Sequence, residues 1–470
     1  MPGNATRTPR VLIAGTGSGC GKTTFVCALM AALTRRGLKV QPFKCGPDYI
    51  DPMFHAFVTG RSSGNLDPFM LPAGTLRYLL QKNAQGADIA VIEGVMGFYD
   101  GLGMGSAAST HEVGMTTKTP TLLVLNAAGM SASLAAVVRG FAQFRPDNGI
   151  AGILLNGVGE RFYKTLKPML EEETGLDVPG FLPRMEDCSL ENRHLGLITA
   201  AEVENLGAKI DALARQAEQS VDLERVLALA SAAPPLPVEP SPLAGISWPR
   251  DAGSFRLGVA RDEAFCFYYG DALDLLEELG AELVFFSPLN DPRLPGELDG
   301  LYLGGGYPEL HAPRLASNGT MLDDLRRQVM GGLPTLAECG GFMTLCRSIR
   351  TDDGIFPMSG VFQGEVRMTR RLVRFGYVEL TAKKAGLLAP AGWTGRGHEF
   401  HYSESTDDGD GFGIGKPDGR TWEGIHTSLP GLPDLPATIH AGYPHLHLYG
   451  DPRLAVNFAN ACRAYKSRSI

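Results

Sequence analysis

Short apolar runs alternate with helix-period segments along the first half of the chain. The runs are rich in Val, Ile, Leu and Ala and cover residues 11–15, 38–44, 88–93, 119–126, 149–158 and 177–184. Strands that are covered on both faces have this pattern, whereas half-exposed strands alternate apolar and polar residues. The pattern therefore predicts a parallel α/β sheet with helices on both faces, followed by a helical region that ends near residue 230.

A second α/β pattern follows a proline-rich stretch. Residues 231–253 interrupt every periodicity and have the composition of an extended, semi-rigid linker. Beyond them, strand-like runs begin near residues 255, 281, 298 and 333, with helix-period segments between them. We therefore expect two α/β domains, 1–230 and 255–470, joined by a linker at 231–254.

Composition and charge argue against several classes of function. The 470 residues carry a formal net charge of −8 and no basic run, which argues against binding to nucleic acid or to an anionic membrane surface. The eight cysteines include no C-x-x-C pair, as is typical of reduced intracellular thiols. Because the sequence also lacks a signal-peptide core and a membrane-length apolar run, we expect a soluble cytoplasmic protein.

The stretch 11–24, VLIAGTGSGCGKTT, has the order strand, glycine-rich turn, helix. Such a turn directs several backbone N–H groups at one spot, and the helix start adds the positive end of its dipole. The pattern is G-T-x-x-x-x-G-K-T, with the leading glycine one place earlier than in the strict phosphate-loop motif. It predicts a nucleotide site in which the Lys22 ammonium contacts phosphate and the Thr23 hydroxyl binds Mg²⁺. The predicted loop residues are Thr16, Gly19, Gly21, Lys22, Thr23 and Thr24.

Acidic residues follow two later strand-like runs. Asp48 and Asp51 lie on a loop after the second run, and Glu93 ends the third. Ligands of open α/β sheets bind at the carboxyl ends of the strands, and carboxylates there hold Mg²⁺ directly or through water. We predict Asp48 and Glu93 as magnesium ligands. The alternatives are helix capping for Asp48 and a solvent-facing position for Glu93.

In the second half, Cys339 lies on a sharp turn between a strand-like run and a helix-period segment. This position holds a thiol clear of its neighbours at the positive end of a helix, which favours the thiolate and its use as a nucleophile. The glycines at 304–306 can offer N–H groups to a developing oxyanion. The other cysteines of this half, Cys266, Cys346 and Cys462, are expected to be buried apolar residues.

Histidines are concentrated in the last third of the chain. His398 and His401 lie three residues apart, and His445 and His447 lie two apart. A cysteine nucleophile needs a base, so we predict that His445 or His447 activates Cys339 and that the other orients it. A metal site formed by the four histidines is the weaker alternative, because no H-E-x-x-H spacing is present.

These motifs together resemble the glutamine-dependent cobyrinate or hydrogenobyrinate a,c-diamide synthases of corrinoid assembly. The matching stretches run in order along nearly the whole chain: GTGSGCGKTT, GPDYIDPMFH, NLD, EGVMGFYDG, RHLGL, LGGGYPEL, AECGGFM, GHEFHYS and YPHLHL. The resemblance implies an N-terminal phosphate-loop domain similar to dethiobiotin synthetase and a C-terminal class I glutamine amidotransferase domain. It also favours a homodimer.

The resemblance further implies roles for residues and substrates. Cys339 matches the glutaminase nucleophile and His445 its activating histidine, whereas His447 stands where other class I enzymes place a glutamate. ATP with Mg²⁺ would phosphorylate a carboxylate of a corrinoid, and ammonia from glutamine would travel to that site and displace phosphate. The candidate substrate-contacting residues are Tyr49, Asp51, Asp100, Gly305, Gly306 and His447.

Three other interpretations stay open. Ni-sirohydrochlorin a,c-diamide synthases share the nucleotide and glutaminase motifs, and cobyric acid synthases amidate other side chains of the same macrocycle. A partitioning-type nucleotide-switch ATPase is the alternative from another functional class. That class carries a second lysine six places before the conserved one, where this chain has Thr16.

Overall fold

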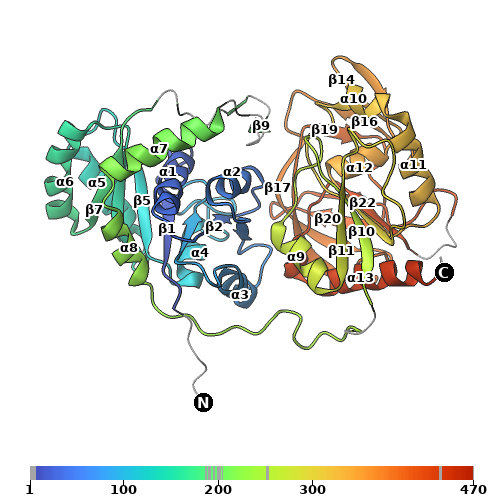
Figure 1. The fold of residues 1–470 in the computed structure, drawn as a ribbon, viewed down its shortest axis with the longest axis horizontal. Coiled ribbons are helices and arrows are strands. Elements are labelled where there is room, and N and C mark those ends of the chain that lie inside the picture. The colour runs from blue at the N-terminus through green and yellow to red at the C-terminus, as the bar shows by residue number, and fades with distance from the viewer. Residues whose placement is uncertain are drawn as a thin grey trace. The chain divides into compact units, whose positions relative to one another are not determined.

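The computed structural model describes residues 7–468, apart from 186–187, 189–191, 194–195, 198–202, 204, 250–252 and 433–436. The chain divides into two compact units, Met1–Ser241 and Pro242–Ile470 (Figure 1). Among the described residues, no helix is long and apolar enough to cross a membrane. His194, which the sequence marks as an ordinary loop or capping histidine, lies outside the described residues.

The first unit is built on a seven-stranded parallel sheet with the order β3-β2-β4-β1-β5-β6-β7. All positions of the central strands β1, β2 and β4 are buried, as the continuous apolar runs require. The strands are β1 Arg10–Gly15, β2 Val40–Cys45, β3 Gly64–Leu66, β4 Ile89–Glu93, β5 Thr121–Asn126, β6 Ile150–Asn156 and β7 Asp177–Leu182.

Helices connect these strands and pack on the sheet (Figure 1). They are α1 Lys22–Arg35, α2 Ile50–Thr59, α3 Ala73–Asn83, α4 Thr110–Thr117, α5 Ser133–Phe144, α6 Glu160–Thr174, α7 Leu206–Ser220 and α8 Leu223–Ser231. A short two-stranded ribbon, β8 Asn192–Arg193 with β9 Gly196–Leu197, precedes α7. Because β4 lies between β2 and β1, the chain reverses its direction of winding beside β1, and ligands of such sheets bind at that point.

The second unit has a five-stranded parallel sheet with the order β11-β10-β12-β13-β22. Its strands are β10 Phe255–Ala260, β11 Ala281–Phe286, β12 Gly300–Leu303, β13 Thr335–Glu338 and β22 Ile439–Gly442. The accompanying helices are α9 Gly270–Glu278, α10 Ala312–Ser317, α11 Gly319–Met330, α12 Gly340–Leu345, α13 Arg453–Lys466 and the 3₁₀ turn η2 Leu448–Gly450. Both units thus confirm the expected α/β fold class.

Two smaller four-stranded sheets in the second unit were not predicted. They have the orders β15-β14-β16-β19 and β18-β17-β20-β21 and are largely antiparallel. Their strands are β14 Ser348–Thr351, β15 Gly354–Pro357, β16 Glu365–Met368, β17 Arg374–Ala382, β18 Thr394–His401, β19 Ser403–Ser405, β20 Phe412–Gly415 and β21 Thr421–Gly424. Their exposed positions break the apolar runs, so periodicity alone does not reveal them.

The first part of the proline-rich stretch is packed on the first unit rather than free. The Arg10 side chain donates to the carbonyl oxygen of Pro234 at 2.5 Å, and Gln81 donates to that of Pro237 at 2.8 Å. Arg77 forms an ion pair with Glu239 at 2.5 Å. Residues up to 241 therefore belong structurally to the first unit.

Candidate functional site

The glycine-rich loop between β1 and α1 closes tightly around the start of the helix. Gly19 and Gly21 have φ values of +73° and +97°, which favour glycine. A Cβ on Gly21 would lie 2.1 Å from Nδ2 of Asn156, which donates to the Cys20 carbonyl oxygen at 3.0 Å. Gly21 is the N-cap of α1 and supplies no side-chain cap, so the first N–H groups of the helix face the loop.

Lys22 lies over this loop. Its Nζ donates to the carbonyl oxygens of Gly17 at 2.9 Å and Met96 at 2.6 Å. Burial lowers the pKa of Lys22, although nearby carboxylates partly oppose this effect. The N–H of Thr16 donates to Val124 on the neighbouring strand at 3.2 Å, and Thr24 lies in the first turn of α1. The loop is thus fixed at both ends, with a cation held against it.

An acidic cluster lies next to Thr23. Its hydroxyl donates to Oε1 of Glu93 at 2.6 Å and lies 3.5 Å from Oδ2 of Asp51. Glu93 is fully buried, and His55 holds its other oxygen through Nε2 at 2.6 Å. Burial alone would raise the pKa of Glu93, but Lys44, His55 and Thr23 outweigh that effect and lower it. The carboxylate is therefore kept charged and fixed in place.

Lys44 is the buried cation of this cluster. It is the register partner of Glu93 on the neighbouring strand, and Nζ lies 3.1 Å from Oε1 of Glu93 and in close contact with Asp51. Burial lowers the pKa of Lys44, but Asp51, Glu93 and Asp48 outweigh it and raise the pKa well above its ordinary value. Burial and the neighbouring carboxylates raise the pKa of Asp51.

Asp48 has the capping contacts that its alternative interpretation predicts. Its Oδ1 accepts from the N–H groups of Ile50 at 2.8 Å and Asp51 at 3.2 Å, while Oδ2 lies 3.7 Å from Lys44 Nζ. One oxygen thus caps α2 and the other faces the cluster, so a capping and a metal-binding role are compatible. Asp100 accepts from the N–H of Gly97 at 3.0 Å and orders the loop after β4.

The donor atoms of this cluster fit Mg²⁺. Thr23 and Glu93 offer oxygens 2.6 Å apart, and carboxylate and hydroxyl oxygens are ligands that Mg²⁺ prefers. Among the described residues, no group of three or more His, Cys, Asp or Glu side chains has the arrangement of a closed metal site. Phosphate oxygens and water would therefore complete the coordination, as is usual for magnesium bound with a nucleotide.

Cys339 lies on a sharp turn between β13 and the short helix α12. Its φ of 48° and ψ of −105° are unusual for a residue with a side chain, and its N–H donates to the Gly442 carbonyl oxygen at 2.8 Å. Cys339 is 6% exposed. Burial and the charge of Glu309 raise its pKa, whereas the N–H of Gly340 opposes this shift. Burial thus outweighs the stabilisation of the thiolate by the helix start, and a base is needed to take the thiol proton.

A glycine-rich turn lies beside this thiol. Gly304, Gly305 and Gly306 follow β12, and the N atom of Gly306 lies 3.2 Å from the position that a Cβ on Gly340 would occupy. A Cβ on Gly305 would lie 2.5 Å from Cε1 of His445. Glycine at positions 305 and 340 therefore lets this turn approach the histidine and the elbow, as an oxyanion site requires.

His445 follows β22 and faces a buried carboxylate. Its Nδ1 lies 3.7 Å from Oε2 of Glu338, the residue directly before Cys339. The Tyr302 hydroxyl donates to the same oxygen at 2.8 Å, and the N–H of Leu446 donates to Oε1 at 2.9 Å. Glu338 is thus held beside the ring, on the side where an orienting acid stands in a Cys-His-acid triad.

His447 differs from the sequence-based expectation. Its ring stacks on Tyr269 at 4.7 Å, and neither ring nitrogen has a hydrogen-bond partner among the described residues. Burial lowers its pKa to about 3. His447 is therefore a neutral, stacked core residue, and Glu338 occupies the place beside His445 that the sequence left open.

The other histidine pair, His398 and His401, packs around the segment that carries His445. His398 and His445 exchange N–H···O=C bonds of 3.1 and 2.8 Å, which join β18 to the loop after β22. Nδ1 of His401 lies 2.8 Å from the Ser403 carbonyl oxygen, and the His401 ring stacks on Tyr443 at 3.8 Å. These contacts give both histidines structural roles.

Sequence reasoning missed Lys44, His55 and Glu338 as parts of the two sites. Lys44 and Glu338 end apolar strands directly before loops that the motifs mark, and such strand-end charges are the signal that could have identified them. His55 ends the GPDYIDPMFH stretch. The pairing of Lys44 with Glu93 depends on strand order, which the sequence does not provide.

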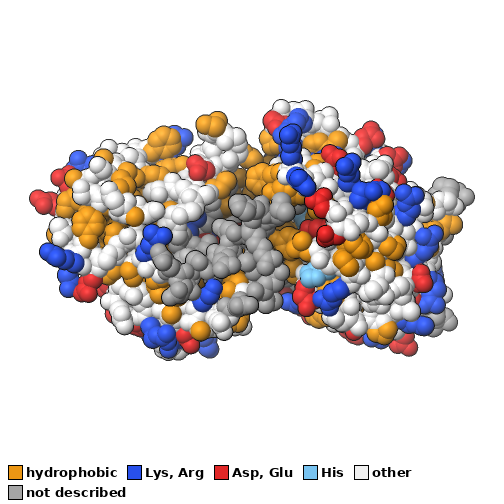
Figure 2. All heavy atoms as spheres, turned by 90° about the horizontal axis from the view of Figure 1, so that it is seen from above, with side chains coloured by type: hydrophobic (Ala, Val, Ile, Leu, Met, Phe, Trp, Pro, Cys, Tyr) orange, Lys and Arg blue, Asp and Glu red, His pale blue; other side chains and the backbone are white. Residues whose placement is uncertain are grey.

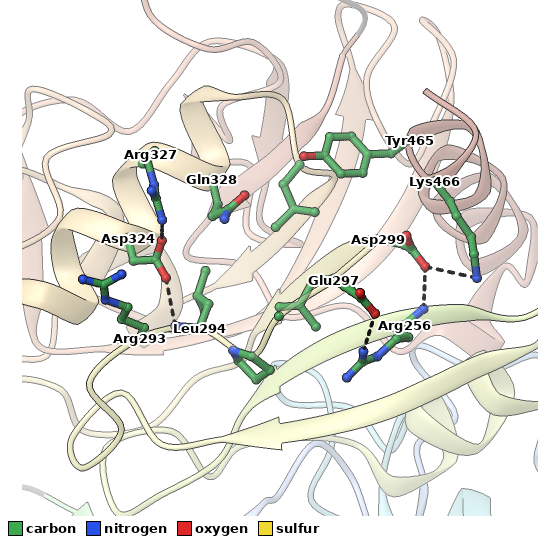
Figure 3. A pocket seen from close by; sticks show the side chains of 14 residues that line it. Arg256, Arg293, Leu294, Glu297, Asp299, Asp324, Arg327, Gln328, Tyr465 and Lys466 are labelled. Atoms are coloured by element: carbon green, nitrogen blue, oxygen red, sulfur yellow. Dashed lines mark hydrogen bonds and ion pairs between the residues drawn. The ribbon is translucent and has the colours of Figure 1, made fainter. Parts of the chain in front are cut away.

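A surface pocket of the second unit lies at the opposite end of its parallel sheet (Figure 3). It lies near the amino ends of β10 and β12, and its charged side chains largely pair with one another, as in Arg256–Glu297 and Asp299–Lys466. Cys339 and Gly304–306 lie at the carboxyl ends. The pocket is therefore separate from the candidate site. On the face in Figure 2, basic and acidic side chains are interspersed over both units.

Comparison with known proteins gives the family. Residues 11–198 match the CobQ/CobB/MinD/ParA nucleotide binding domain, and residues 256–452 match the CobB/CobQ-like glutamine amidotransferase domain. The cobyrinate a,c-diamide synthase of Priestia megaterium is 40% identical over 97% of this chain and 98% of its own length. The chain belongs to the cobyrinate a,c-diamide synthase family.

Other members of the cobyrinate a,c-diamide synthase family are similar to this chain over most of its length. The protein of Thermoplasma volcanium is 39% identical over 99% of this chain and 100% of its own length. That of Salmonella typhimurium is 43% identical over 85% of this chain and 87% of its own length. The family resemblance is thereby confirmed, and the chain is an enzyme with a nucleotide-binding domain followed by a glutamine amidotransferase domain.

Proposed function

We propose that this chain amidates the a- and c-acetate carboxylates of cobyrinate or a closely related corrinoid precursor, with ATP and glutamine as co-substrates. The observation that carries the proposal is the presence of two complementary sites in one chain. One unit holds a phosphate loop with a buried acidic cluster, and the other holds a cysteine elbow with His445 and Glu338. Relatives of the same length carry the name of this activity.

In the second unit, Cys339 would attack the side-chain amide carbon of glutamine. His445 takes the thiol proton and returns it to the leaving nitrogen, which departs as ammonia and leaves a thioester. The N–H groups near Gly305 and Gly306 stabilise the oxyanion. Water then hydrolyses the thioester to glutamate and restores the thiol. Glu338 orients His445 and stabilises its protonated form.

In the first unit, ATP would transfer its terminal phosphoryl group to a carboxylate of the macrocycle. A carboxylate is a poor acceptor for ammonia, because oxide is a poor leaving group, and the acyl phosphate supplies a good one. Ammonia attacks its carbonyl carbon, and phosphate departs as the amide forms. Lys22 offsets negative charge on the phosphoryl group, and Thr23, Glu93 and Asp48 would hold Mg²⁺, which neutralises phosphate charge.

The testing experiment is a competition assay followed by mass spectrometry. The purified protein receives cobyrinate, hydrogenobyrinate and Ni-sirohydrochlorin together, with Mg-ATP and glutamine labelled with ¹⁵N in its amide. We expect two labelled nitrogens on cobyrinate or hydrogenobyrinate. Label on Ni-sirohydrochlorin would show that this macrocycle, rather than a corrinoid precursor, is the acceptor. Glutamine hydrolysis without any macrocycle product would remove the tetrapyrrole assignment, and absence of hydrolysis would reject the glutaminase.

A further inference from the structure

Glu399 is a buried carboxylate without a hydrogen bond. It lies on β18, is fully buried, and neither of its oxygens has a hydrogen-bond partner among the described residues. Nε2 of His401 is 4.0 Å from Oε2, too far for a hydrogen bond. Burial raises the pKa of Glu399 to about 7 and lowers that of His401 to about 3. Such an unsatisfied group is costly, so its presence calls for a ligand.

The nearest cations of the chain are bound to other partners. Arg374 pairs with Asp408 at 3.3 Å, and its guanidinium lies 4.5 Å from the centre of the Trp422 ring. Lys416 donates to the carbonyl oxygen of Phe375. Both cations lower the pKa of Glu399 through their charge, yet neither forms a hydrogen bond with it. The two buried carboxylate oxygens thus lack a hydrogen-bonded cation among the described residues.

The face of β18 that carries Glu399 packs against the segment that holds His445 and Tyr443. Residues 397, 399 and 401 share this face, because side chains alternate along a strand. A Cβ on Gly397 would lie 2.7 Å from the His445 carbonyl oxygen. The His401 ring stacks on Tyr443, the neighbour of the Gly442 carbonyl that accepts from Cys339. The charge of Glu399 also contributes to the raised pKa of Cys339.

We propose that Glu399 binds the α-ammonium group of the glutamine whose amide is cleaved at Cys339, and this inference rests on the proposed glutaminase. An ammonium group offers a positive charge and three N–H donors, which match a carboxylate whose two oxygens lack a hydrogen-bond partner among the described residues. This contact selects glutamine among primary amides, because an analogue without the ammonium leaves the buried carboxylate unpaired.

The test compares glutamine with glutaramate, which is glutamine without its α-amino group, as substrates of the full chain. For Glu399→Gln we expect the KM of glutamine to rise by on the order of 10- to 100-fold. With glutaramate, the ratio kcat/KM is expected to stay near its wild-type value, so the preference for glutamine disappears. Glu404→Gln, an exposed neighbour on β19, serves as the matched control and should keep the preference.

Further variants separate the outcomes. Glu399→Asp keeps the charge and should keep part of the preference, and the hydrolysis of glutaramate, which uses the same unit, shows that each variant is folded. The proposal is overturned if Glu399→Gln keeps the full preference for glutamine over glutaramate. It is overturned as well if the variant loses kcat/KM equally for both substrates. It is also overturned if Glu309→Gln, at another acid whose charge acts on Cys339, loses the preference instead. A wild-type chain that leaves glutamine intact would reject the proposed function itself.

Discussion

The Glu338 carboxylate contacts His445, Tyr302 and the backbone of Leu446 while 2% exposed. We expect Glu338→Gln to reduce the kcat of glutamine hydrolysis on the order of 100-fold, since an orienting acid fixes the ring and stabilises its charged form. Glu338→Asp keeps the charge and should recover part of the rate, which an assay of glutamate release measures.

His447→Phe is the matched control for this prediction. Phenylalanine can keep the stack on Tyr269, and His447 has no hydrogen bond to lose among the described residues. We expect a glutaminase rate within a few-fold of the wild type. If His447→Phe slowed hydrolysis as much as Glu338→Gln does, His447 would be the orienting residue and Glu338 a structural one.

Burial of Glu399 makes the stability of the chain depend on pH. Its pKa is raised from 4.5 to about 7 in the folded chain, so the folded state binds the proton more tightly than the unfolded state does. Stability from this group is therefore greatest below pH 4.5 and is lost as the pH rises to about 7. We expect Glu399→Gln to exceed the wild type in free energy of unfolding by about 3 kcal/mol at pH 8 and by less than about 1 kcal/mol at pH 5.

Urea unfolding of the full chain at several pH values checks this prediction, with Glu404→Gln as the exposed control. A difference that is constant across pH would show that Glu399 is already charged at pH 5 in the folded chain. This measurement needs no substrate, so it is independent of the ligand proposed for Glu399.

How far single residues could be predicted depends on what fixes their role. The roles of Lys22 and Thr23 follow from a local motif, because loop, helix start and side chain are contiguous. Those of Lys44 and Glu338 depend on partners far along the chain, Glu93 and His445, which strand order brings together. Sequence periodicity does not contain that order.

At the scale of elements, the turn at Cys339 combines a reactive side chain with a strained backbone. Its φ and ψ of 48° and −105° are unusual for a residue with a Cβ and cost about 1–3 kcal/mol. We expect Cys339→Gly to have a free energy of unfolding about 1 kcal/mol above that of Cys339→Ala, since glycine relieves the strain and both variants lack the thiol.

Denaturant unfolding of the two variants tests this, and Cys346 supplies the control. Cys346 is also buried but has an ordinary φ of −69°, so there glycine should be less stable than alanine. Equal stability of Cys339→Gly and Cys339→Ala would mean that the turn is unstrained when no substrate is bound.

The strands that could be predicted were those whose residues form a nearly continuous apolar run in the sequence. The central strands of the first sheet, such as β1 and β4, follow from apolar runs, because burial on both faces leaves few polar positions. The strand β17, by contrast, alternates buried and exposed residues, and polar residues occupy most of β18. The second domain was predicted from its parallel strands alone. The two smaller sheets, one of which carries Glu399 on β18, were therefore missed.

At the scale of the whole molecule, each unit contains one half of the proposed chemistry. Lys22 and its acidic cluster lie at the carboxyl ends of β1, β2 and β4 in the first unit, and Cys339 follows β13 in the second. The homodimer expected from the family resemblance stays a prediction. The two half-reactions share one intermediate, ammonia, so supplying it from outside should separate them.

We expect Cys339→Ala to lose glutamine-driven amidation but to keep amidation with ammonium salts, since its phosphate loop is intact. Lys22→Met should lose amidation with either nitrogen donor while it still hydrolyses glutamine. Mass spectrometry of the macrocycle and a glutamate assay measure the two halves separately. A Cys339→Ala chain that is inactive with ammonia would show that the thiol serves the first unit as well. A Lys22→Met chain that no longer hydrolyses glutamine would show instead that the glutaminase depends on a nucleotide-bound first unit. The first outcome would mean that one residue takes part in both reactions, and the second that nucleotide binding in one unit controls the reaction in the other.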